Sequence, residues 1–171
     1  MELLEKFFKE WGIPILCAVF LAFLVNRFIF FNVNVPTESM YPTIKPRDKI
    51  FVTRIHSQES LQRGDIIVFK SEELEEDLIK RLIGLPGDHI EIKADGTMYI
   101  NGKLIEEDYV VYNSNKQAIF DVPEDCYVFC GDNRNNSLDA RYWDNPYINY
   151  KDIKGKARFI ISPFSRWGKL N

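Results

Sequence analysis

The chain has 171 residues, of which 46% are hydrophobic and 27% charged, and its formal net charge at pH 7 is −3. This length accommodates one modest domain, and a slightly acidic chain with mixed charges gives no reason to expect a nucleic-acid partner. With three cysteines and two histidines, the chain lacks the usual ligand sets for zinc, so we expect no metal and no cofactor.

The first predicted element is an apolar segment near the N-terminus. Residues 13–25 are all apolar, and after Asn26 and Arg27 the run resumes at residues 28–31. A helix over residues 13–31 contains 19 residues. These residues span about 28 Å at ~1.5 Å each, close to the ~30 Å of a bilayer core. The segment therefore predicts a transmembrane anchor helix at residues 12–31, preceded by a short segment at residues 1–11.

Two other interpretations of this segment are a removable signal peptide and a buried helix of a soluble domain. Residues 31–36, which follow the apolar run, lack the small-residue cleavage pattern of signal peptides. The segment is also apolar all round rather than on one face, unlike a helix at the surface of a core. A permanent anchor is favoured, but basic residues lie on both sides of it, so charge alone leaves its orientation open.

Beyond Pro36 the sequence predicts β structure. Residues 49–55, 65–70, 77–83 and 158–162 have the composition of strands. Asp95-Gly96 separates two further strands at residues 88–93 and 97–100, which predicts a hairpin, and Asn101-Gly102 is a candidate for a second tight turn. We therefore predict that residues 32–171 form a mainly β domain of twisted antiparallel sheets, with a small β cap at about residues 89–125.

Two residues of this domain could form a catalytic pair. Ser39 lies in the run PTESMYPT at residues 36–43, and Lys80 lies in the predicted strand 77–83, on one face with Leu78 and Leu82. Burial of that face would lower the pKa of the lysine, typically to ~7–8 in a catalytic lysine, and a neutral amine can deprotonate a serine. The alternative is an ordinary strand lysine that extends its charged group to solvent.

Four segments resemble, in order and spacing, the motifs of the bacterial type I signal peptidases. They are residues 36–43, 64–69, 80–88 and the run GDNRNNSLDAR at residues 131–141. The resemblance implies a membrane-anchored serine endopeptidase that removes signal peptides from exported preproteins after a small-x-small site. In this interpretation Ser39 is the nucleophile and Lys80 the general base.

The same resemblance implies a place in the cell and a set of partners. It predicts a single-pass protein of the bacterial cell membrane, with residues 1–11 in the cytoplasm and the catalytic domain at residues 32–171 outside. Its partners would be preproteins emerging from the secretion translocase and the lipid of the membrane.

The resemblance also assigns supporting roles within the site. Thr37 matches a hydroxyl residue that helps to stabilise the oxyanion, although a turn residue bonding its own backbone is an equal alternative. Ser137 matches a serine that orients the amine of the lysine. Three further residues match a set that holds the last motif together, with the last two as a charge-assisted pair: Asp132, Asp139 and Arg141.

The chain departs from the family pattern at two positions of these motifs. Glu38 stands where a small residue is frequent, and we expect its side chain to point away from the catalytic pair. Ala140 stands where serine is common, which removes a hydroxyl but neither member of the pair. Met40 is expected to pack beneath the turn that carries the nucleophile.

Other catalytic groups are disfavoured by the sequence. His56 and His89 could in principle complete a triad with Asp132 or Asp139, but neither has a partner evident in the sequence. Cys126 and Cys130 lie in one predicted strand, about 13 Å apart at ~3.3 Å per residue, which is too far for a disulfide.

Substrate selection and membrane contact can be predicted in outline. The two small side chains at the end of a signal peptide require two shallow apolar pockets beside an exposed strand edge, and we expect Ile44 and residues 78–83 to line them. Trp167 either contacts lipid or completes the core. Two other functions remain open, a non-catalytic scaffold on this fold and a self-cleaving regulator, although the latter would carry a DNA-binding module in place of the apolar segment.

Overall fold

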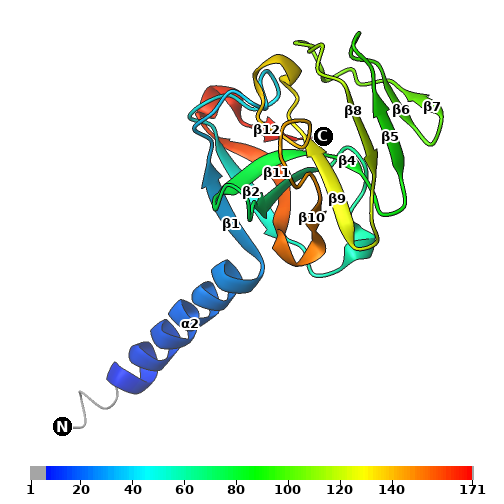
Figure 1. Cartoon of the computed structure of the whole chain (residues 1–171). Helices are drawn as coiled ribbons and strands as arrows, with labels where there is room; N and C mark the ends of the chain where they lie inside the picture. The colour runs from blue at the N-terminus through cyan, green and yellow to red at the C-terminus, as the bar shows by residue number, and fades with distance from the viewer. Residues whose placement is uncertain (1–6, 171) are drawn as a thin grey trace.

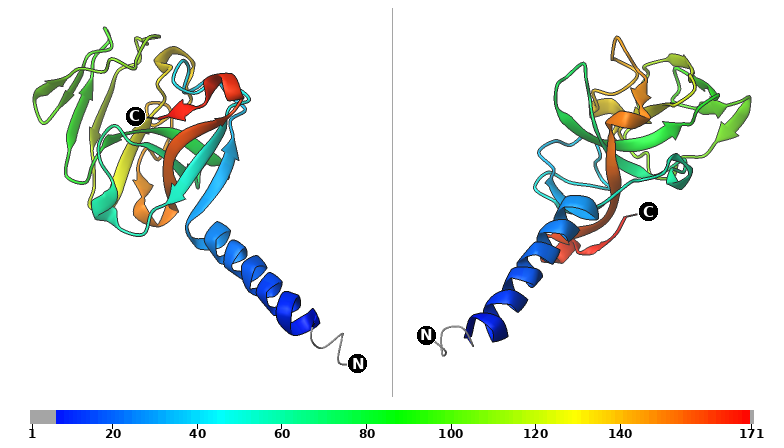
Figure 2. Two further views of the ribbon diagram at one scale, coloured as in Figure 1. Left: turned by 180° about the vertical axis from the view of Figure 1, so that it is seen from behind. Right: turned by 90° about the horizontal axis from the view of Figure 1, so that it is seen from below.

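The computed structural model describes residues 7–170 and consists of an N-terminal helix followed by a β domain (Figure 1). The helix begins with a π-helical turn, η1 (Phe8–Gly12), and continues as the α-helix α2 (Ile13–Phe28). It projects away from the β domain in all three views (Figures 1 and 2). Within residues 7–170, no helix has both the length and the apolar character needed to cross a membrane.

The helix ends three residues earlier than the predicted span. We expected it to reach Phe31, but α2 stops at Phe28 and the strand β1 (Phe30–Asn34) begins almost at once. β1 pairs with β2 (Lys49–Arg54), with Phe30 opposite Thr53 and Asn34 opposite Lys49. The apolar side chains of Phe31 and Val33 alternate with polar ones, which suits a strand that packs on one face. Pairing with β2 provides hydrogen-bond partners for the backbone N–H and C=O groups that a longer helix would have paired internally.

The main sheet has eight strands, and every pair of neighbouring strands is antiparallel. Their order is β1-β2-β11-β3-β4-β9-β10, and β12 pairs with β11. The strands not yet given are β3 (Ile66–Lys70), β4 (Asp77–Gly84), β9 (Cys126–Cys130), β10 (Ile148–Asn149), β11 (Ile153–Ser162) and β12 (Gly168–Lys169). The predicted mainly β class is confirmed, and the predicted strand at 158–162 is the end of the longer β11.

A second sheet of four strands lies at the end of the β domain remote from α2 (Figure 1). Its order is β7-β6-β5-β8, formed by β5 (His89–Ile92), β6 (Met98–Ile100), β7 (Lys103–Ile105) and β8 (Ala118–Asp121). The turn at Asn101-Gly102 joins β6 to β7, and both of its residues have positive φ, 52° and 76°. This small sheet falls inside the segment predicted as a cap.

Alternate residues of β3 belong to two different cores, which shows that the main sheet is covered on both faces. Ile66 and Val68 pack with Met40 and Ile50 on one side, whereas Ile67 and Phe69 pack with residues of β9 and the small sheet on the other. Four short 3-10 helices lie in the connections: η2 (Gln58–Ser60), η3 (Arg134–Asn136), η4 (Tyr150–Asp152) and η5 (Phe164–Arg166). Trp167 does not complete the core, because 66% of it is exposed and its ring stacks on Phe164.

Candidate active site

Ser39 lies in the loop that connects β1 to β2. The residue is buried, and the loop is held by two side chains, Met40 and Ile44, that are fully buried in the core next to Ile50. Met40 therefore packs beneath the serine as predicted. Ile44 does not line a groove, contrary to our expectation, because its side chain points into the core and anchors the loop.

Lys80 lies in the middle of β4, opposite Ile67 of β3, and its side chain reaches Ser39. Its Nζ donates a hydrogen bond to Ser39 Oγ over 2.5 Å. Burial lowers the pKa of Lys80 to about 8, although the negative charge of Asp139 acts in the opposite direction. Only 4% of the lysine is exposed, so its amine is held next to the hydroxyl in a state that can lose its proton near neutral pH.

Thr37 provides a second hydroxyl beside the serine. Thr37 Oγ1 lies 3.3 Å from Ser39 Oγ, and Thr37 is exposed whereas Ser39 is buried. The two hydroxyls therefore lie together at the border between the protein interior and solvent.

The loop at residues 131–141 follows β9 and is stabilised by a buried ion pair. Arg141 donates from Nε and Nη2 to the two oxygens of Asp139, over 2.8 and 2.9 Å, which is the pair that the sequence predicted. Asp139 also accepts the backbone N–H of Gly131 over 2.9 Å. Burial alone would raise the pKa of Asp139, but the hydrogen bonds and charge of Arg141 lower it, so the carboxylate stays ionised.

Asp132 connects three segments of the site. Arg81, the neighbour of Lys80 in β4, donates to both of its oxygens over 2.8 and 2.7 Å. Asp132 also accepts the hydroxyl of Thr43, from the loop that carries Ser39, over 2.6 Å. The backbone N–H of Asn133 donates to the carbonyl of Ser39 over 3.1 Å. β4, the nucleophile's loop and the loop 131–141 are therefore fixed relative to one another.

Ser137 lies close to this junction, but its predicted hydrogen bond to Lys80 is not formed. Its Oγ is buried and forms no close hydrogen bond among residues 7–170, but its hydroxyl lies near Asp139 and helps to lower the pKa of that carboxylate. The chain approaches closely here because residue 131 is a glycine. A Cβ at that position would lie 2.3 Å from both Ser137 Oγ and the carbonyl oxygen of Ser39.

A cleft with a volume of about 580 Å³ opens over Ser39 and Lys80. The other residues that line it are Pro36, Thr37, Glu38, Pro46, Leu74, Glu76, Leu78, Asn136 and Leu138. Glu38 was expected to point away from the pair, but it lines this cleft and its carboxylate is within 3.4 Å of Asn136 Nδ2. A solvent-filled cleft keeps the exposed carboxylate hydrated, which explains why this orientation is tolerated.

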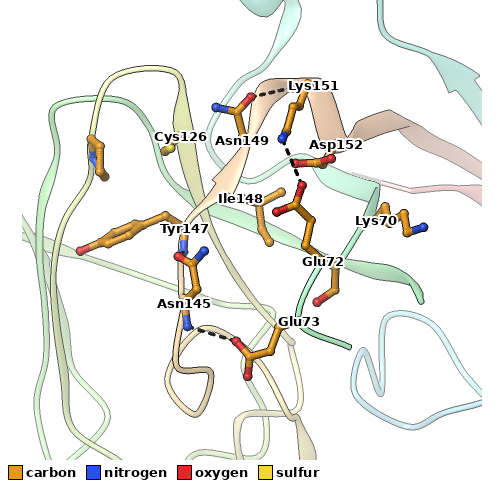
Figure 3. A pocket seen from close by; sticks show the side chains of 12 residues that line it. Lys70, Glu72, Glu73, Cys126, Asn145, Tyr147, Ile148, Asn149, Lys151 and Asp152 are labelled. Carbon is orange, nitrogen blue, oxygen red and sulfur yellow. Dashed lines mark hydrogen bonds and ion pairs between the residues drawn. The ribbon is translucent and has the colours of Figure 1, made fainter. Parts of the chain in front are cut away.

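A second hollow, of about 250 Å³, is lined in part by the turn between β3 and β4, which also lines the cleft over Ser39 (Figure 3). Glu73 of that turn accepts the backbone N–H groups of Asp144 and Asn145 over 3.3 and 3.1 Å. Glu72 pairs with Lys151 over 3.0 Å. Glu72 and Glu73 therefore bind groups of the protein itself. We interpret these contacts as fixing the turn between β3 and β4, which also places Leu74 and Glu76 in the wall of the cleft.

The two histidines are engaged with partners outside this constellation. His56 bonds to the carbonyl of Phe28, and His89 to Asp121 of the small sheet over 2.6 Å. The hydrogen bond to Asp121 raises the pKa of His89. Cys126 and Cys130 are free thiols. Within residues 7–170 no three histidine, cysteine, aspartate or glutamate side chains are grouped as metal ligands.

Comparison with known proteins agrees with this geometry. The profile of the family described as signal peptidase, peptidase S26, matches residues 8–162. The chain belongs to this family. It is 38% identical to Signal peptidase I S of Bacillus subtilis (strain 168), over 98% of this chain and 96% of that protein. It is 33% identical to the Probable signal peptidase I-2 of Synechocystis sp., over 97% of this chain and 78% of that protein.

A solved structure leads to the same family. The crystal structure of a signal peptidase I from Enterococcus faecalis V583 is 36% identical and superposes with a TM-score of 0.50, covering 58% of this chain and 98% of that one. The resemblance seen in the sequence motifs is therefore confirmed, and the S26 chain described here is a serine endopeptidase, a hydrolase of peptide bonds.

Proposed function

We propose that the chain removes signal peptides from exported preproteins, cleaving after a small-x-small sequence with Ser39 as nucleophile and Lys80 as general base. The observation that carries this proposal is the 2.5 Å contact between Lys80 Nζ and Ser39 Oγ. The lysine is buried, which lowers its pKa to about 8. The hydroxyl of a serine is a weak nucleophile unless a base of this kind lies within hydrogen-bond reach.

The reaction follows from this arrangement. Lys80 takes the proton of Ser39 as Oγ attacks the carbonyl carbon of the cleaved bond, and the resulting ammonium then protonates the departing amine. The acyl-enzyme is hydrolysed by water that Lys80 deprotonates in the same way. The Ser39 N–H and the hydroxyl of Thr37 are the proposed donors to the oxyanion, and Thr37 Oγ1 already lies 3.3 Å from Ser39 Oγ.

Ser137 has a proposed place later in this cycle. Its Oγ is buried and forms no close hydrogen bond within residues 7–170, although its hydroxyl is near enough to Asp139 to help lower the pKa of that carboxylate. Once Ser39 is acylated, Lys80 loses its hydrogen-bond acceptor, and the hydroxyl of Ser137 could then hold the amine. This would keep Lys80 oriented for the hydrolytic step.

The substrate is proposed to bind as an added strand along β4. Residues 77–81 of β4 pair with β3 on one edge, but pairing with β9 on the other edge begins only at Arg81. The edge that carries Leu78 and Lys80 can therefore accept an extended peptide. Leu74, Leu78 and Leu138 give the cleft an apolar wall, which suits the two small side chains that precede the cleaved bond.

We further propose that the N-terminal helix anchors the enzyme in the bacterial cell membrane, with its N-terminus in the cytoplasm and the β domain outside. Large apolar side chains are exposed along α2 and have no core to cover them, as Leu16 (70%), Val19 (62%) and Phe23 (60%) show. An exposed apolar surface of this extent is typical of contact with lipid or another protein. Residues 1–6, part of the predicted cytoplasmic segment, lie outside the described chain.

Cleavage of a preprotein with an Ala-x-Ala site by the purified protein in detergent tests this function. Ser39→Ala and Lys80→Ala should each be folded yet inactive, and Lys80→Arg should also fail because a guanidinium does not lose its proton at accessible pH. Lys103→Ala, at an exposed position of β7, is the matched control and should retain full activity. Retained cleavage by the Lys80→Ala protein would refute the proposed base.

A further inference from the structure

The segment of residues 107–112 leaves the small sheet after β7 and runs along the loop and strand that hold the catalytic pair. Its contacts there include a ring contact between Tyr112 and Tyr41 and three polar contacts. Glu107 binds Arg134, Tyr109 lies over Arg81, and the carbonyl of Tyr112 accepts the backbone N–H of Asn135 over 3.2 Å. Two of these contacts involve buried arginines of the catalytic framework.

Glu107 neutralises an arginine that lies within the loop 131–141. Arg134 donates from Nη1 and Nη2 to the two carboxylate oxygens of Glu107 over 2.8 and 2.6 Å. Only 2% of the arginine side chain and 8% of the glutamate side chain are exposed. Arg134 Nε donates to the carbonyl of Gly131 over 3.0 Å, and Gly131 is the residue whose Cα lies against the backbone of Ser39.

Tyr109 makes the corresponding contact with β4. Arg81 Cζ lies 3.9 Å from the centre of the Tyr109 ring, close enough for a cation–π interaction. Arg81 is the residue next to Lys80, and its guanidinium binds Asp132. The hydroxyl of Tyr109 donates to Glu107 Oε1 over 2.5 Å. Glu107 and Tyr109 therefore form one unit that holds two arginines, Arg134 of the loop 131–141 and Arg81 of β4.

We propose that Glu107 and Tyr109 are positioning residues for the reaction of Ser39 with Lys80. Neither residue lines the cleft, so they act through Arg134 and Arg81 by fixing the loop 131–141 and β4 relative to each other. Removal of the carboxylate leaves the buried Arg134 without its counter-charge, and the arginine must then move and release Gly131. A small displacement of two reacting groups reduces the rate strongly. This inference rests on the proposed function.

Glu107→Gln tests the role of the carboxylate, with Glu106→Gln as a matched control. Glu106 is adjacent in sequence and its side chain is exposed. Glu106→Gln therefore removes the same charge without disturbing a buried ion pair. We expect kcat per folded molecule to fall about tenfold in Glu107→Gln while KM stays within about twofold. The control should leave both constants unchanged. A merely structural role would lower the melting temperature without changing kcat of the folded fraction.

Two further comparisons locate the effect. If Glu107 acts through Arg134, the double variant Glu107→Gln/Arg134→Met should have the same kcat as Arg134→Met alone, whereas independent effects would multiply. Tyr109→Phe retains the ring over Arg81 and should have a higher kcat than Tyr109→Leu, which loses it. The comparison of these two tyrosine variants decides the question even where Glu107→Gln fails to fold.

The outcomes distinguish this inference from the proposed function. Full kcat in folded Glu107→Gln and in Tyr109→Leu, with Ser39→Ala and Lys80→Ala inactive, would overturn the positioning role and leave the catalytic pair intact. An increase in KM with unchanged kcat would also overturn it, because such a residue would contact substrate instead. Activity in Lys80→Ala would remove the proposed function, and the positioning role with it.

Discussion

At the scale of single residues, opposing influences set the protonation of Lys80. Burial lowers its pKa, whereas the negative charges of Asp139 and Glu76 raise it, and the result is a pKa of about 8. Asp139 is buried and engaged with Arg141, so it also maintains the loop. Glu76 is exposed at the rim of the cleft, so its influence on the lysine can be removed with little structural change.

We predict that kcat/KM increases with pH up to about 8 and then levels, because the neutral amine is the active form. Glu76→Gln removes a carboxylate that raises the pKa of Lys80, so this pKa should fall and the acidic limb of the profile should move to lower pH. Rates measured from pH 5 to 10 on one peptide substrate test both statements.

Glu75→Gln is the control for this experiment, because the side chain is exposed and adjacent in sequence. Its pH profile should coincide with that of the unmodified protein. A value of kcat/KM that stays constant below neutral pH would contradict a lysine base at position 80. A shift of the acidic limb of the profile to higher pH in Glu76→Gln would also contradict it.

At the scale of structural elements, the site is a junction of three segments that are distant in sequence. β4 brings Lys80, the loop after β1 brings Ser39, and the loop after β9 brings Asp132, which bonds to the other two segments. The junction is tight at Gly131, where the backbone of Ser39 and the hydroxyl of Ser137 leave no space for a side chain. The distance between Ser39 and Lys80 therefore depends on how closely these loops pack.

Gly131→Ala is expected to separate the loops. Its Cβ would lie 2.3 Å from Ser39 O, and overpacking of this kind typically costs ~1–3 kcal/mol of unfolding free energy. Because the backbone of the nucleophile must move, cleavage should fall further than the loss of folded protein explains. Urea unfolding and the rate per folded molecule measure the two effects.

Gly168→Ala is the matched substitution for this prediction. The nearest atom to its Cβ would be 3.8 Å away, so stability and activity should both be retained. Equal behaviour of the two variants would contradict the tight junction at Gly131.

At the scale of the whole molecule, the helix and the catalytic cleft belong to separate parts. α2 projects from the β domain (Figure 2), whereas β1 is paired along its length with β2. The fold of the β domain therefore requires β1 but not the helix. Phe164 and Trp167, which are 87% and 66% exposed, form a second apolar surface on the β domain.

A chain that begins at Ile29 should fold and cleave a soluble peptide at a rate close to that of the full protein in detergent. It should no longer sediment with lipid vesicles, because the exposed apolar side chains of α2 are removed. Circular dichroism, peptide cleavage and vesicle co-sedimentation measure these properties. Undiminished binding of the shortened chain to vesicles would assign membrane contact to Phe164 and Trp167 instead of the helix.

Local chemistry by itself determined much of this protein. Alternation of residues predicted β2 and β4, and a short apolar run predicted β3. Asp95-Gly96 predicted a hairpin of the small sheet and Asn101-Gly102 a second tight turn, because these signals depend only on neighbouring residues. The family motifs indicated Ser39 and Lys80. β1 was not predicted, because the apolar run before it extended the predicted helix to Phe31.

Tertiary structure decided the features that depend on segments far apart in the chain. It alone placed Lys80 Nζ at Ser39 Oγ, 41 residues away, turned Glu38 toward the cleft and left Ser137 without a hydrogen bond to Lys80. It also brought Glu107 and Tyr109 onto Arg134 and Arg81. No local pattern encodes these contacts, because each depends on the packing of elements from different parts of the chain, and burial then sets the pKa that the chemistry requires.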